Sequence, residues 1–338
     1  MSQSLAVRYR PQTLEEIVGQ GITVEILKRA IEKRNFKHAY LFTGPSGTGK
    51  TTCARCLATA INQGQGRPEE IDAASNNGVD QVRAIVEAGR QRAVDAEYKI
   101  FIIDECHAIT IQGWQAFLKG IEEPSPFTIY IFCTTEPNKV PETVLNRVQR
   151  YNITKISSEE IFKRLCQICA NENFSNYEAA CDFISKTSHG CMRDAIMRLD
   201  QCADFSTDLS LTNVEQVLNN SHHRAMFILV NALFNKDVET ILYCTDKLSS
   251  TGVDLKSFIE LFLEFAIDLN KYAIFKTLQV TNIPEYLLPT VQDFSAMVVD
   301  TNWYTRLIEL LLKIKLEIRY DTNYKSTIEA FLLQFCRS

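Results

Sequence analysis

The first half of the chain alternates between short apolar runs and longer stretches with a helical period. The apolar runs are rich in β-branched and aromatic residues and lie at 39–43, 99–103 and 127–133. Amphipathic helical stretches separate them, near 21–34, 50–62, 78–93 and 111–122. Apolar strands that alternate with helices predict a parallel sheet covered on both faces, and hence an α/β fold.

After about residue 155 the pattern becomes helical, and no further strand run appears. Ser157 and Glu160 have the spacing of a capping box, which predicts a helix start. The predicted helix carries an apolar face formed by Ile161, Leu165 and Ile168. The patterns divide the chain into an α/β core (1–155), a small helical lid (156–220) and an all-α C-terminal domain (221–338).

The composition is that of a soluble globular protein, with 46% hydrophobic and 23% charged residues. No window approaches 18 consecutive apolar residues, so we expect no membrane span and no membrane partner. The first residues lack the apolar stretch of a signal peptide, and the chain has 11 cysteines. These features indicate a reducing compartment and a cytoplasmic location, in the host cytoplasm if a phage encodes the chain.

The charge is unevenly distributed. Residues 1–155 carry 19 Lys and Arg against 17 Asp and Glu, whereas the remainder carries 17 against 24, which gives the net charge of −5. This balance excludes a uniformly basic nucleic-acid-binding protein. Any DNA contact must come from a local patch, for which the candidates are Arg83, Arg90 and Arg92 on the predicted helix 78–93. A solvated helix face explains these arginines equally well.

A complete phosphate-binding motif, G-x-x-x-x-G-K-T, lies between the predicted strand 39–43 and the predicted helix 50–62. Its residues are Gly44, Pro45, Ser46, Gly47, Thr48, Gly49, Lys50 and Thr51, with Thr52 directly after them. Small residues let backbone N–H groups surround phosphates at a helix N-terminus. We expect Lys50 to contact the β- and γ-phosphates of ATP and Thr51 to bind Mg²⁺.

Asp104 and Glu105 follow the predicted strand 99–103, where a second acidic motif belongs. We expect Asp104 to hold Mg²⁺ and Glu105 to act as the catalytic base that activates water. Thr134 and Thr135 follow the next strand, where a hydroxyl could hold the attacking water or simply cap the strand.

Several motifs, in this order along residues 6–203, resemble those of the AAA+ clamp-loader ATPases, and within them the bacterial DNA polymerase III gamma/tau family. They are Tyr9-Arg10-Pro11 with Val18-Gly19-Gln20, the phosphate loop, 70–79, Asp104-Glu105-Cys106-His107, Thr134-Thr135-Glu136-Pro137 and Arg193-Asp194-Ala195. The resemblance implies a P-loop AAA+ core, a helical lid and a C-terminal collar domain that joins subunits.

The resemblance also implies residue roles. Tyr9, Arg10, Pro11 and Val18 would line the adenine pocket. Thr135 would sense the γ-phosphate, and Arg193 would reach the nucleotide from the lid. Arg147 matches the family's arginine finger, which acts in trans on the ATP of a neighbouring subunit. Its flanking residues, Asn146 and Val148, differ from the family's Ser-Arg-Cys triplet.

Two further departures concern zinc and length. The family's four-cysteine zinc module is missing from residues 62–69, and the C-x-x-C pairs Cys53/Cys56 and Cys166/Cys169 fall in predicted helices. We therefore expect ATP and Mg²⁺ as cofactors and no zinc, although buried thiols and a zinc site both remain open. The chain also stops at Ser338 without the long tail of the tau form, which would suit a compact loader.

The implied function is that of an ATPase motor subunit in a ring or spiral of five loader subunits. Such a subunit couples ATP to the opening of a sliding clamp and its loading on primer–template DNA. Two alternatives remain open. One is another AAA+ DNA remodeller, such as a branch-migration motor, and the other is a structural loader subunit without hydrolysis.

Overall fold

The computed structural model describes residues 3–218, 221–250, 253–298, 300, 302–321 and 323–337. The chain divides into two compact units, Met1–Ile168 with Ser188–Asp200, and Cys169–Thr187 with Gln201–Ser338. It therefore passes from one unit to the other three times. These bounds differ from the predicted parts 1–155, 156–220 and 221–338. The last two residues of the predicted lid, 219 and 220, lie outside the described residues.

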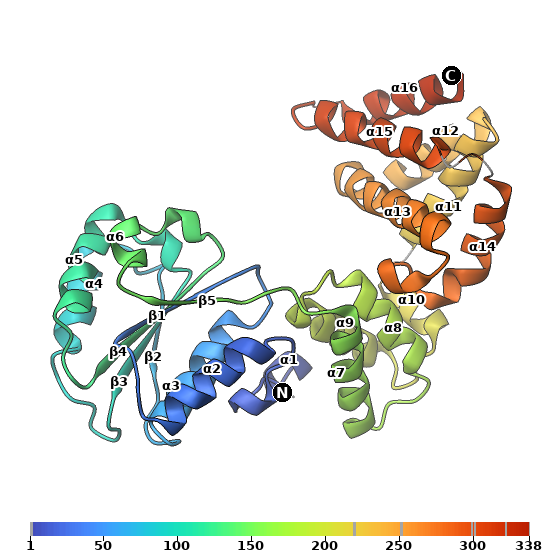
Figure 1. Ribbon diagram of the computed structural model, residues 1–338. Helices are drawn as coiled ribbons and strands as arrows, with labels where there is room; N and C mark the ends of the chain where they lie inside the picture. The colour runs from blue at the N-terminus through green and yellow to red at the C-terminus, as the bar shows by residue number, and fades with distance from the viewer. Residues whose placement is uncertain are drawn as a thin grey trace. The chain divides into compact units, whose positions relative to one another are not determined.

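The first unit is built on a five-stranded parallel sheet with the order β2-β3-β4-β1-β5 (Figure 1). The strands are β1 (Ala39–Thr43), β2 (Glu69–Asp72), β3 (Lys99–Asp104), β4 (Thr128–Thr134) and β5 (Gln149–Asn152). The helices are α1 (Leu5–Arg8), α2 (Gly21–Glu32), α3 (Lys50–Ile61), α4 (Val79–Ala88), α5 (Ile111–Glu122) and α6 (Glu142–Leu145). Short 3-10 helices lie at Leu14–Glu16, Cys106–Ala108 and Pro137–Lys139.

Helices cover both faces of this sheet, as the continuous apolar strands predict (Figure 1). On one face, Phe42 and Ile131 pack with Leu57 of α3 and Leu27 of α2. On the other face, strand residues pack with α4 and α5, where Trp114 and Phe117 are almost fully buried. The predicted α/β P-loop core is therefore confirmed.

Two strands and one helix end differ from the prediction. The strands β2 and β5 were not predicted, because they form the edges of the sheet and their residues are mostly polar and exposed. The helix predicted at 78–93 ends at Ala88, which is a correction. Gly89 follows, with its carbonyl bound by the Thr128 hydroxyl, and glycine is a poor helix former.

The second unit is helical. It contains α8 (Glu178–Thr187), α10 (Leu211–Val217), α11 (Ser221–Phe234), α12 (Val238–Ser250), α13 (Leu255–Phe275), α14 (Leu288–Met297), α15 (Asn302–Glu317) and α16 (Tyr324–Arg337). Short 3-10 helices lie at Leu278–Val280 and Glu285–Leu287. A single apolar core runs through α11 to α16, with Phe262, Leu307 and Leu311 fully buried within it. The predicted helical character is confirmed, and within the described residues after 155 no strand forms.

The helices α7 (Ser158–Asn171) and α9 (Met192–Phe205) each begin in the first unit and end in the second. The predicted capping box opens α7, because the Ser157 hydroxyl accepts from the Glu160 N–H at 3.3 Å and the Glu160 carboxylate accepts from the Ser157 N–H at 3.3 Å. The predicted apolar face of α7, Ile161, Leu165 and Ile168, is fully buried. No helix among the described residues is long and apolar enough to cross a membrane.

Candidate functional site

The phosphate loop connects the carboxyl end of β1 to the amino end of α3. Strand β1 ends at Thr43, and Lys50 is the first residue of α3. The Gly44 N–H donates to the Thr134 carbonyl at 3.3 Å, which fastens the loop to the end of β4. The motif thus lies between the predicted strand and the predicted helix, with the helix N-terminus facing the loop.

Glycine is required at two positions of this loop for steric reasons. Gly44 has φ 151°, and a Cβ there would lie 2.0 Å from the Ile153 carbonyl oxygen. Gly47 has φ 70°, and a Cβ there would lie 2.1 Å from the Cys191 Sγ. Such contacts are far below van der Waals separation. The loop conformation is therefore available only to glycine at these two places.

We predict that Gly47→Ala destabilises the first unit and weakens nucleotide binding. The clash with Cys191 and the strained φ cost about 1–3 kcal/mol each. Thermal unfolding and a fluorescent ATP-analogue titration measure the two effects. Adding Cys191→Ala should recover part of the loss, because it removes the sulfur but leaves the φ strain. Equal stability of Gly47→Ala and the wild type would contradict this packing.

Lys50, Thr51 and Asp104 meet at the carboxyl ends of β1 and β3. The Thr51 hydroxyl donates to Asp104 Oδ2 at 2.8 Å. Lys50 is 6% exposed, and its Nζ donates to the Pro45 carbonyl at 2.9 Å, inside the loop. A hydroxyl and a carboxylate in contact provide the hard oxygen ligands that Mg²⁺ prefers. The predicted pair of metal-binding residues is therefore brought together.

Glu105 has a strained backbone, with φ 46° and ψ 42°. Its N–H donates to Asp104 Oδ1 at 2.9 Å, which stabilises this conformation. Its Oε2 lies 3.4 Å from the Thr135 hydroxyl, which donates to it. A residue other than glycine in the left-handed region costs about 1–3 kcal/mol and is often found at functional sites. The candidate base and the candidate γ-phosphate sensor are thus neighbours.

His107 and Glu136 lie near Glu105, and the sequence analysis assigned no role to either of them. The His107 ring lies within 3.3 Å of both Glu105 Oε2 and Glu136 Oε1. The Lys139 ammonium, together with a weaker contribution from His107, lowers the pKa of Glu136. The only feature of the sequence that could have suggested this contact is the position of His107, two residues after Glu105.

Arg193 lies beside the phosphate loop. It is the second residue of α9, and its N–H donates to the Gly47 carbonyl at 3.3 Å. Its side chain is exposed. The main chain of Arg193 therefore contacts the phosphate loop. Contact of its guanidinium with nucleotide stays a prediction.

Arg147 lies on the short segment between α6 and β5 and is exposed. Its Nη2 forms an ion pair with Glu122 Oε1 at 2.9 Å, and its Nη1 donates to the Thr143 carbonyl at 2.8 Å. An exposed pair of this kind contributes at most about 1 kcal/mol. A stronger anion could therefore take the guanidinium from Glu122.

The predicted adenine-pocket residues lie near the N-terminus. The Tyr9 carbonyl accepts from Arg164 Nη2 at 3.0 Å, and the Pro11 carbonyl accepts from the Cys56 thiol at 3.4 Å. Tyr9, Arg10, Pro11 and Val18 are all partly buried. Their role in binding adenine stays a prediction.

The three arginines proposed for DNA contact do not share one helix. Arg83 lies on α4 and pairs with Asp80 at 3.5 Å. Arg90 and Arg92 lie beyond the end of α4, which corrects their predicted placement on it. Arg90 pairs with Glu87 at 3.0 Å, and Arg92 lies over the Phe127 ring at 5.3 Å. All three are exposed, and their contact with DNA stays a prediction.

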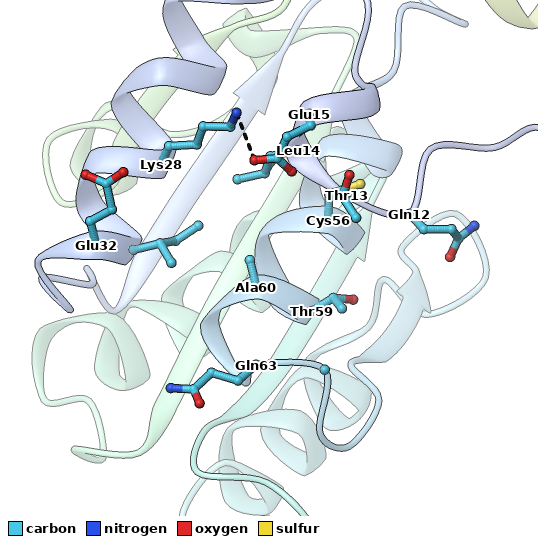
Figure 2. A pocket seen from close by; sticks show the side chains of 12 residues that line it. Gln12, Thr13, Leu14, Glu15, Lys28, Glu32, Cys56, Thr59, Ala60 and Gln63 are labelled. Carbon is cyan, nitrogen blue, oxygen red and sulfur yellow. Dashed lines mark ion pairs between the residues drawn. The ribbon is translucent and has the colours of Figure 1, made fainter.

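A pocket of about 440 Å³ lies between α2, α3 and the segment 12–15 (Figure 2). Lys28 and Glu15 form an ion pair across its edge at 2.8 Å. Thr59, Ala60 and Gln63 line it from the C-terminal end of α3 and beyond. Thr59 is about 14 Å along the helix axis from Lys50, so this pocket is separate from the phosphate loop.

The cysteine pairs lie within helices, as predicted. Cys53 and Cys56 are buried in α3, and burial raises the pKa of both thiols to about 12. Among the described residues, no group of three or more His, Cys, Asp or Glu side chains is arranged to hold a metal ion. The expectation of no zinc stays a prediction.

Comparison with known proteins gives matches along most of the chain. The family model for the DNA polymerase III delta subunit matches residues 19–78 and 71–157. The tau subunit of DNA polymerase III from Bacillus subtilis is 31% identical over 99% of this chain and 63% of its own length. The gamma subunit from Buchnera aphidicola (subsp. Acyrthosiphon pisum) is 26% identical over 98% of both chains. The chain is a homologue of the DNA polymerase III gamma and tau subunits.

Some of these homologues are longer than this chain. It spans 63% of the Bacillus subtilis tau subunit and 52% of the gamma/tau subunit of Mycoplasma genitalium. Among solved structures, the RuvB Holliday junction branch migration motor of Thermotoga maritima matches with a TM-score of 0.54 and 19% identity. This match covers 73% of this chain and 86% of RuvB. It shows that the two chains share a fold over the matched part.

Proposed function

We propose that this gamma/tau homologue is the ATPase motor subunit of a loader for a DNA polymerase sliding clamp. The main support for the proposal is one similarity. The match to a gamma subunit of DNA polymerase III covers 98% of this chain and 98% of that subunit. The site supports the proposal, because the Thr51 hydroxyl contacts the Asp104 carboxylate and the Lys50 ammonium lies inside the phosphate loop.

The cofactors would be ATP and Mg²⁺, which supply the triphosphate and neutralise its charge. The Thr51 hydroxyl and the Asp104 carboxylate fit the metal as oxygen ligands. The loop from Gly44 to Gly49 fits phosphate, because its glycines leave the backbone uncovered. Lys50 would pair with the phosphates, and Thr52 would lie beside them on α3.

The hydrolytic step would be carried out by side chains around Glu105. The Glu105 carboxylate would accept a proton from the attacking water, and the Thr135 hydroxyl beside it would orient the γ-phosphate. Arg193 would approach the same phosphate from α9. Arg147 would stabilise charge on the ATP of a neighbouring subunit.

The partners would be other loader subunits in a ring or spiral of five, a sliding clamp and primer–template DNA. The core 1–155 and the lid 156–220 would close on ATP, and the helices of 221–338 would form the collar. Arg83, Arg90 and Arg92 are candidates for phosphate contacts with DNA. DNA-stimulated hydrolysis would release the loaded clamp.

Neither alternative gains support. A branch-migration motor of the RuvB class would need a DNA-binding winged helix with strands, whereas the described residues after 220 form helices and loops and no strand. An inert structural subunit is disfavoured by the complete set of Lys50, Asp104 and Glu105.

The test is ATP turnover by the purified chain, alone and with its companion subunits, clamp and primed DNA. We expect turnover to rise when clamp and primed DNA are both present. Unwinding of duplex DNA without a clamp would support the branch-migration motor. No turnover in any assembly would support the inert subunit. No affinity for adenine nucleotide would contradict the whole proposal, and the mass of the complex tests the five-subunit assembly.

A further inference from the structure

The His107 ring lies between two carboxylates that come from different strands. His107 belongs to the short helix Cys106–Ala108 after β3, and Glu136 follows β4. Nδ1 lies 3.3 Å from Glu105 Oε2, and Nε2 lies 3.3 Å from Glu136 Oε1. One imidazole therefore connects the candidate base with the turn that carries Thr135.

The ring also contacts one fully buried group, and its partner Glu136 is held by further contacts. Nδ1 also lies 3.1 Å from the hydroxyl of Thr134, which is fully buried. The same hydroxyl oxygen accepts from the Glu136 N–H at 2.9 Å. The Glu136 carboxylate is in turn paired with Lys139 at 2.9 Å. The His107 side chain is only 20% exposed, so it has little room to leave.

The chemistry of the two contacts defines what the ring can do. A carboxylate only accepts hydrogen bonds, so the approach of Nδ1 to Glu105 is attractive when Nδ1 carries the hydrogen. Thr135 donates to the same oxygen, Oε2, at 3.4 Å. The Thr135 hydroxyl therefore donates to Oε2 of Glu105, and the His107 ring lies beside the same oxygen.

We propose that His107 is a positioning residue for ATP hydrolysis, which holds the Glu105 carboxylate in the orientation that activates water. The Glu136 carboxylate lies at the opposite edge of the ring, and both carboxylate contacts are attractive together when both ring nitrogens carry hydrogen. This inference rests on the proposed ATPase function. A base must be within hydrogen-bond reach of the proton that it accepts, and a misplacement of about 1 Å can cost roughly 10²-fold in rate.

The test compares three substitutions of His107 in the full chain, assembled with its companions, clamp and primed DNA. We expect His107→Ala to lower kcat by roughly 10- to 100-fold, which is less than the loss of the base itself. KM and the affinity for an ATP analogue should stay within about twofold, because the contacts of the ring are with Glu105, Thr134 and Glu136 and not with the residues of the phosphate loop.

The other two substitutions separate the two edges of the ring. The asparagine amide can place a donor near the Nδ1 position, so His107→Asn should recover most of the turnover. The glutamine amide reaches the Nε2 position, so His107→Gln should recover less. In a Glu105→Gln background, His107→Ala should cause no further loss, because the group that it positions is already inactive.

His38 provides a matched control. It is also a partly buried histidine with an Nδ1 contact, 3.1 Å from the Thr128 carbonyl, but it lies at the amino end of β1. His38→Ala should leave kcat unchanged. Normal or faster turnover of folded His107→Ala would overturn the positioning role, as would full rescue by Gln but not by Asn. If the wild-type assembly hydrolyses no ATP, the proposed function itself fails, and this inference fails with it.

Discussion

Glu105→Gln is expected to leave ATP bound and to slow its hydrolysis by roughly 10²- to 10⁴-fold, the range for loss of a general base. Glutamine keeps the size of the side chain but cannot accept a proton from water. The binding groups are separate, since Lys50 and Thr51 lie on α3 whereas Glu105 follows β3. Nucleotide affinity should therefore stay near that of the wild type.

The measurement combines an ATP-binding titration with single-turnover hydrolysis. Lys50→Ala is the contrasting variant and should lose binding, because it removes the buried ammonium of the loop. Glu123→Gln, at an exposed residue directly after α5, should behave like the wild type. Equal loss of binding and hydrolysis in Glu105→Gln would mean that this carboxylate has a structural role.

Arg147→Ala is expected to spare ATP binding by its own chain and to slow turnover of the assembled complex by roughly 10³-fold or more, as for loss of an arginine finger. The ion pair with Glu122 that it removes is exposed on both sides and contributes little to folding. The chain alone should therefore keep its thermal stability.

Mixed assemblies test whether Arg147 acts in trans. A complex of Lys50→Ala and Arg147→Ala subunits should recover part of the turnover that each variant lacks alone. In that complex an intact arginine can face an intact phosphate loop across an interface. Arg150→Ala, a nearby exposed arginine on β5, is the control and should leave turnover unchanged. Normal turnover of an all-Arg147→Ala complex would show that another residue is the finger.

The parts of the fold that the sequence predicted are those governed by local patterns. The strands β1, β3 and β4 are buried along nearly their whole length, so their apolar runs are visible. The edge strand β5 has exposed residues such as Arg150 and pairs on one side only, so hydrogen bonding to β1 and not burial defines it. The predicted helix 78–93 was too long at its C-terminal end, because the residues after Gly89 are polar and compatible with a helix.

In the candidate site, too, local motifs could be predicted, whereas contacts between distant segments could not. The phosphate loop and the Asp104–Glu105 pair could be predicted because their chemistry lies in contiguous residues. The contact of His107 with Glu136 could not, because it depends on β3 and β4 lying side by side in the sheet. The pairing of Arg147 with Glu122 likewise requires knowing which helix lies near the segment before β5.

The three passages of the chain between its two units limit how the protein can be dissected. A fragment that ends at residue 155 would lack 188–200, which belong to the first unit and include the α9 residues beside Gly47. A single proteolytic cut near Thr187 would leave both other passages intact, so each fragment would still join a part of the first unit to a part of the second. An isolated ATPase core would therefore need residues 188–200 rejoined to residue 168 by a designed linker.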